Sequence, residues 1–160
     1  MHTILTHSAA KAGLFARVTR GVRALRKGLD FMTPLGDLAI RLWAANVFWK
    51  SGMVKFQSFD STLLLFQYEY SVPLLPPDVA AYLSTFSELF FSALLALGLG
   101  GRLGAAMLFV VNIVAVISYP ELTDAGREQH YLWGLLLLAS LLHGPGKLSI
   151  DHLIASKLGV

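Results

Sequence analysis

The sequence contains no cysteine and few charged residues, which make up 14% of its 160 residues. Without cysteine, the chain cannot form disulfides, use a thiol as a nucleophile or bind a metal through thiolates. It also has no Walker loop, no dinucleotide fingerprint and no serine–histidine–aspartate arrangement. Its glycine cluster at 98–104 follows an apolar run and is typical of a hairpin rather than of a phosphate cradle. These absences exclude most soluble enzyme classes.

The scarcity of charge is matched by a high apolar content: 55% of the residues are hydrophobic, and the mean hydropathy is +0.60. Soluble domains carry about 25% charged residues, so this chain has too few to cover a water-exposed surface. The sequence therefore predicts an integral membrane protein, with the lipid bilayer as its partner. Nucleic-acid binding is not expected, because the basic residues crowd one N-terminal stretch that carries no nucleic-acid motif.

Four apolar runs predict an all-α fold, a membrane four-helix bundle, because a spanning helix needs about 20 mostly apolar residues. Pro34 opens the first run, Asp78 is the expected N-cap of the second, and Thr123 is the expected N-cap of the fourth. Gly144 begins the sequence that stops the fourth helix. The predicted spans are residues 35–53, 79–99, 103–119 and 124–143.

The segments outside these spans divide the chain into a basic N-terminal part at 1–33, a transmembrane domain at 34–153 and a tail at 154–160. Within the first part, residues 11–29 have an apolar stripe between arginines and lysines. This pattern predicts an amphipathic helix that lies in the headgroup plane, held by anionic lipid. A solvated tail is the alternative.

A further short helix is expected at 61–70, capped by Asp60 and lying across the outer ends of the bundle. Its aromatic residues suit a membrane interface. Lysines and arginines set the topology: nine lie on the side of both termini, whereas Lys55 and Arg127 are the two in the opposite loops. The positive-inside rule then predicts a multi-pass protein of a bacterial inner membrane with both termini in the cytoplasm.

Four polar residues within the spans are candidates for function: Arg41, Glu88, Asn112 and His130. An ionisable group at mid-depth costs roughly 3 kcal/mol by insertion scales, so such groups face the bundle interior and find partners. We expect Arg41 and Glu88 to form an ion pair, with Asn112 joining by hydrogen bonds. The ionisation state of Glu88 is left open. The pair either binds a ligand or only fixes helix packing.

His130 and Trp133 lie three residues apart on one helix face at the outer membrane level. They are either an interfacial histidine with an aromatic anchor, or the rim of a ligand pocket with Tyr119 and the helix at 56–70 as further walls. Gln57 and Glu69 of that segment are further candidate site residues. No metal site is expected, because no Glu-x-x-His pattern appears.

The order of several short segments resembles the DoxX family of small bacterial four-helix membrane proteins, over about residues 36–153. The segments are Arg41 with Phe48, Gly52 and Lys55; the run 56–60 with Gln57; Glu69 and Tyr70; the run 72–77; Glu88 and Leu89; the turn 97–102; Tyr119 and Pro120; His130; Trp133 and Gly134; and the run 144–151. The resemblance implies the bundle fold and an inner-membrane location. It also hints at quinone chemistry, because a related protein is a membrane subunit of a quinone-reducing enzyme.

Three functions follow as hypotheses. The first is a membrane subunit of a quinone-linked oxidoreductase system, in which an apolar cavity has Arg41, Glu88 or His130 at its polar end; a partner protein would supply the electrons. The second is a non-catalytic scaffold or assembly factor, with a tightly packed bundle and no cavity. The third is a small proton-coupled carrier, for which a homodimer would supply eight spans. No cofactor other than a quinone is indicated, and catalytic residues are not identified.

Overall fold

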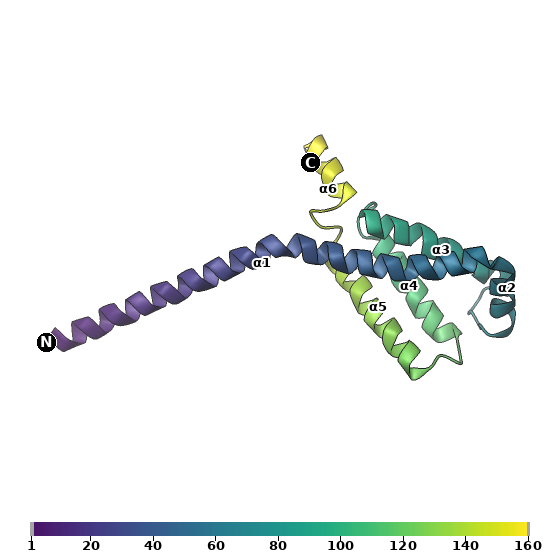
Figure 1. The fold of residues 1–160 in the computed structure, drawn as a ribbon, viewed down its shortest axis with the longest axis horizontal. Helices are drawn as coiled ribbons and strands as arrows, with labels where there is room; N and C mark the ends of the chain where they lie inside the picture. The colour runs from purple at the N-terminus through teal and green to yellow at the C-terminus, as the bar shows by residue number, and fades with distance from the viewer. Residues whose placement is uncertain (1, 160) are drawn as a thin grey trace. The chain divides into compact units, whose positions relative to one another are not determined.

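The computed structural model describes the backbone of residues 2–159 and the side chains of residues 17–159, and the described part of the chain is entirely helical, with no strand. Figure 1 shows the helices in chain order. The chain divides into two compact units, residues 1–35 and 36–160. The six helices are α1 (His2–Gln57), α2 (Phe59–Tyr68), α3 (Pro77–Leu97), α4 (Leu103–Ser118), α5 (Asp124–His143) and α6 (Ile150–Leu158).

The first unit consists of the N-terminal part of α1. The helix predicted at 11–29 is confirmed, and Val18, Val22, Leu25 and Leu29 form an exposed apolar stripe at helical spacing. The prediction that Pro34 opens a new helix is wrong, because α1 continues through it.

The core of the second unit combines residues from α1, α3, α4 and α5. Ala44, Ala45 and Phe48 of α1 pack with apolar residues of the other three helices. Residues of α2 and of the α2–α3 connection form a second, smaller cluster against the start of α3, around the buried Phe66. The residues from the other helices in the larger core are Leu95, Ala105, Leu108 and Leu137.

In this unit, small side chains are common at buried positions and large apolar side chains are common at exposed ones, unlike in a soluble protein. Many buried positions hold small or hydroxyl side chains, such as Ala81, Ser92 and Ala105, whereas large apolar side chains face outward. At Gly104 the backbones of two helices come close together: a Cβ there would lie 3.0 Å from the Leu95 nitrogen of α3. Small residues at helix contacts and an apolar exterior are typical of helices packed in lipid. Outward-facing residues include Trp43, Trp49, Phe86, Phe90, Val110, Ile113, Ile117, Leu132, Leu135 and Leu142.

Several predicted boundaries need correction. The short helix begins at Phe59 with Ser58 at its N-cap, so Asp60 lies inside the helix and is not its cap. The second apolar helix has Pro76 at its N-cap, so the prediction that Asp78 is the N-cap is wrong; the helix begins at Pro77, the first helical position, where proline's missing N–H costs nothing. The tail predicted from 154 is helical in α6. The prediction for Thr123 is confirmed, since its side chain accepts a hydrogen bond from the Gly126 nitrogen.

By length and composition, α3 is the one helix among the described residues that is long and apolar enough to cross a membrane. The helix α4 is also apolar but is shorter, with 16 residues. The first turns of α5 are polar, as the sequence indicated.

Candidate functional site

The central feature of the second unit is a buried ion pair between Lys55 of α1 and Glu88 of α3. The Lys55 Nζ lies 2.8 Å from Oε1 and 2.7 Å from Oε2 of Glu88, and it also donates to the Ser51 hydroxyl at 2.8 Å. The side chains are 15% and 7% exposed. Gly52 makes this meeting feasible, because a Cβ there would lie 3.0 Å from the Cβ of Glu88. The two helices therefore approach closely just where the carboxylate leaves α3.

The prediction that Arg41 pairs with Glu88 is wrong. The Arg41 guanidinium is buried, and it donates to the backbone oxygens of Pro145 and Leu148, the latter at 2.6 Å. It lies beside Gly98, at the end of α3. Glu88 is ten residues earlier on that helix, which corresponds to about 15 Å along its axis. The two groups are therefore at different depths, and Arg41 holds the C-terminal segment instead.

Around Arg41, the turn after α3 is fixed by the segment that follows α5. Gly98 has a positive φ of 63°, which favours glycine at this helix end. The Asp151 carboxylate accepts hydrogen bonds from the backbone nitrogens of Gly100 and Gly101. Arg102 donates to the Leu142 oxygen near the end of α5 at 3.1 Å. This cluster ties α1, α3, α4 and α5 together at one end.

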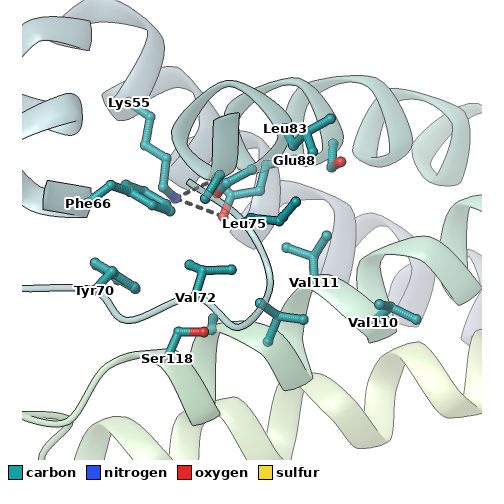
Figure 2. Close-up of a pocket in the computed structure, with 15 residues that line it drawn as sticks. Lys55, Phe66, Tyr70, Val72, Leu75, Leu83, Glu88, Val110, Val111 and Ser118 are labelled. Atoms are coloured by element: carbon teal, nitrogen blue, oxygen red, sulfur yellow. Dashed lines mark hydrogen bonds and ion pairs between the residues drawn. The ribbon is translucent and has the colours of Figure 1, made fainter. Parts of the chain in front are cut away.

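An apolar cavity of about 160 Å³ adjoins the Lys55–Glu88 pair. Figure 2 shows the Lys55 side chain reaching the Glu88 carboxylate, with Tyr70, Val72 and Ser118 below the pair in that view. The walls come from α1, α2, the α2–α3 connection, α3 and α4. The lining residues are Lys55, Phe66, Tyr70, Val72, Leu75, Ala80, Leu83, Ser84, Ser87, Glu88, Val110, Val111, Val114, Ala115 and Ser118.

Four hydroxyl side chains line this cavity apart from the ion pair, those of Tyr70, Ser84, Ser87 and Ser118. Ser118 is completely buried, and its hydroxyl makes no hydrogen bond within the described part of the chain. A buried polar group without a partner costs about 1–3 kcal/mol, so it marks a place where a partner fits. Tyr70 stacks between Phe66 and Tyr119, with ring centroids 4.8 Å and 5.0 Å away. Burial, together with the nearby Glu88 carboxylate, raises the pKa of the Tyr70 hydroxyl, which therefore stays protonated.

Asn112 and His130 form a separate polar pair between α4 and α5. The Asn112 Nδ2 donates to the His130 backbone oxygen at 2.9 Å, and the Asn112 Oδ1 lies 2.8 Å from the His130 Nδ1. Because an amide oxygen only accepts, the Nδ1 carries the proton. The His130 ring packs edge to face on the Trp133 ring, with 4.8 Å between the two ring centroids. Asn112 thus joins His130 rather than the expected Arg41–Glu88 pair.

The predicted pocket forms only in part: His130 and Asn112 line a pocket of about 430 Å³ between α4 and α5, whereas Trp133 and Tyr119 do not line it. Trp133 contacts Phe48 of α1, at a centroid distance of 6.3 Å. Tyr119 instead donates to the Glu69 carboxylate at 3.3 Å and stacks on Tyr70, on the wall of the cavity next to Glu88. The candidate Gln57 is exposed at the last position of α1 and does not line the cavity.

Sequence reasoning missed Lys55 and Ser118 as site residues. Lys55 lay just beyond the predicted end of the first span and counted only toward topology. Its spacing of three residues from Gly52 places both on one helix face, which was the available signal. Among the described residues, no group of three histidines, aspartates or glutamates could hold a metal ion.

An all-helical unit with small and polar residues inside and large apolar residues outside is typical of a membrane protein. The model of the DoxX family matches residues 36–120, just over half of the chain, and the protein belongs to this family of membrane proteins. The matched region includes every residue that lines the cavity beside Glu88. The comparisons with curated proteins and with solved structures gave no match.

Proposed function

We propose that this DoxX-family protein crosses a bacterial inner membrane four times and binds a quinone-type molecule in the cavity beside Glu88, as the membrane subunit of a quinone-linked oxidoreductase system. The observation that carries the proposal is the apolar cavity of about 160 Å³ with the Lys55–Glu88 ion pair at its polar end. A mostly apolar pocket with a few converging polar groups is the usual form of a small-molecule site.

The four proposed spans are the second half of α1, α3, α4 and α5. With a rise of 1.5 Å per residue, the 21 residues of α3 reach about 32 Å and the 16 residues of α4 about 24 Å, against a hydrocarbon thickness of about 30 Å. Bilayer thinning and flanking interfacial residues accommodate the shorter helix at modest cost. Both termini are on the lysine- and arginine-rich, cytoplasmic side.

The size and chemistry of the cavity suit a single substituted ring. An apolar protein cavity of about 150 Å³ binds benzene, so this one has room for a quinone ring. Glu88, Tyr70 and Ser118 would contact the oxygens of that ring, and the valines of α4 would contact its apolar faces. When bound, a quinone supplies two-electron redox chemistry that no side chain here offers.

The electrons in this proposal come from a partner protein, because the chain has no cysteine to act as a thiol reductant. The scaffold hypothesis requires a filled bundle interior, which the cavity does not favour. The proton-coupled carrier hypothesis has no separate observation in its support.

The function is tested by extracting lipids from the purified protein and identifying quinones by mass spectrometry. We expect a quinone in stoichiometric amount in the wild type. Val111→Phe, which fills the cavity, should remove it. Ile113→Phe, which adds the same ring to the outward face of α4, should retain it. Equal quinone content in the two variants would show that the molecule is bound elsewhere, and its absence from the wild type would contradict the proposal.

The topology is open to a separate test because the chain has no native cysteine. Ser61 of α2 and Ser156 of α6 are both exposed and are suitable labelling positions. A cysteine at 61 should react with an impermeant thiol reagent in intact cells, whereas one at 156 should react only after the membrane is opened. Labelling of both in intact cells would refute the four-span arrangement.

A further inference from the structure

The ammonium group of Lys55 has no free proton to offer a ligand. A lysine ammonium carries three donors. Here they are directed at Ser51, at 2.8 Å, and at the two carboxylate oxygens of Glu88, at 2.8 and 2.7 Å. A carbonyl group that entered the cavity would have to displace one of these contacts to obtain a hydrogen bond from Lys55.

The carboxylate of Glu88, by contrast, has an acceptor site that no contact among the described residues uses. Each of its oxygens accepts one bond from Lys55, and a carboxylate has about four acceptor sites in all. The Ser51 side chain also hydrogen-bonds to this carboxylate, which leaves about one acceptor site for a donor in the cavity that Glu88 lines. A hydroxyl group of a ligand can donate a hydrogen bond to the carboxylate. A carbonyl oxygen is repelled by it, because that oxygen carries a partial negative charge.

The second polar contact comes from Ser118 on α4. Its hydroxyl is buried, lines the cavity and has no partner within the described residues. The backbone carbonyl of Ser118 accepts from the Ser71 nitrogen at 2.8 Å, which fixes the backbone from which this hydroxyl extends. A serine hydroxyl donates equally well to a carbonyl, ether or hydroxyl oxygen, so it positions a ring without selecting its redox form.

We propose that the cavity selects the reduced, hydroxyl-bearing form of its ligand: a quinol, with one hydroxyl donating to Glu88 and a second oxygen accepting from Ser118. This inference rests on the proposed function, because it names the form of the same ligand in the same cavity. Glu88 is the group that discriminates, and Ser118 holds the ring.

The test uses the full chain in lipid nanodiscs, with one short-chain quinone and its quinol titrated under anaerobic conditions. We expect the quinol to bind about ten- to a hundredfold more tightly, which is the range for a hydrogen bond to a charged acceptor. Equal or tighter binding of the quinone would overturn this inference and leave the proposed function standing. Binding of neither form would refute the proposed function itself.

Two variants locate the selectivity. Glu88→Gln should bring the ratio of the two affinities to near one or reverse it, because the glutamine amide can donate to a carbonyl. Ser118→Ala should weaken both forms by a similar factor of about five, the loss of one neutral hydrogen bond. Ser92→Ala is the matched control, since this buried serine donates to the Leu89 oxygen and does not line the cavity.

The variants remain informative if one of them folds poorly. Where Glu88→Gln is unstable, the double change Lys55→Met with Glu88→Gln removes both charges together and should show the same loss of preference. An unchanged ratio in either folded variant would show that Glu88 does not select the ligand, and a Ser118→Ala effect on one form only would contradict the role given to Ser118.

Discussion

Replacing Lys55 by methionine should destabilise the protein by about 3–5 kcal/mol, the cost of removing one partner from a buried ion pair. Methionine keeps the length and the unbranched stem of lysine but removes the charge and all three hydrogen bonds. The Glu88 side chain, 7% exposed, would then have no cation in contact. The close approach at Gly52 leaves little room for the carboxylate to turn away from α1.

The matched control is Lys50→Met, on the same helix but at an exposed position, with an expected change within about 0.5 kcal/mol. The double variant Lys55→Met with Glu88→Leu should recover most of the loss, because it removes the stranded charge as well as its partner. The assay is unfolding by increasing denaturing detergent in mixed micelles, followed by circular dichroism. A double variant as unstable as Lys55→Met alone would refute the reasoning, because the damage would then come from packing and not from the carboxylate.

Three further changes test the packing around this pair. Arg41→Lys should cost about 1.5–3 kcal/mol, since lysine cannot reproduce the two-armed contact with Pro145 and Leu148; faster amide exchange at 144–149 would report it, and unchanged exchange would contradict it. Gly104→Val should cost about 1–3 kcal/mol through its clash with the α3 backbone, measured against a near-neutral Gly36→Ala, which has open space. Burial raises the pKa of Tyr70, so its contribution to stability is lost only as pH rises above 10.0 through the folded-state value, and Tyr70→Phe should remove this alkaline decline.

The positions of the helices in the second unit could largely be predicted from the sequence. Apolar runs bounded by proline and glycine leave few choices, and α5 matches its predicted bounds of 124–143. Pro34 misled the prediction because a proline within a helix costs about 3 kcal/mol in general. Here the helix continues, and the Thr33 hydroxyl donates to the Leu29 carbonyl one turn earlier, at 3.0 Å. That bond does not replace the one lost at Pro34, which would have joined the residue 34 nitrogen to the Asp30 carbonyl.

The partners within the bundle were harder to predict because they depend on depth and not on sequence order. Arg41 and Glu88 each stood near the middle of a predicted span, but the middle of a span is undefined when α1 extends over 56 residues. Lys55 stood outside the span, yet its four-carbon stem reaches back to Glu88. Hydropathy locates a helix to within a turn or so, and one turn is about 5.4 Å, more than the length of a hydrogen bond.

The two buried cations of α1 bear on how a ligand reaches the cavity. Arg41 and Lys55 lie 14 residues apart, about 21 Å along the helix, and each is held by hydrogen bonds. Sliding or turning α1 would therefore break both sets of contacts at once. The α2–α3 connection is the irregular wall of the same cavity, and its Leu74 is a non-glycine residue with a positive φ of 67°. Displacing this short connection would break one backbone hydrogen bond to α4, from the Ser71 nitrogen to the Ser118 oxygen, so we expect the proposed ligand to reach Glu88 between the connection and α4.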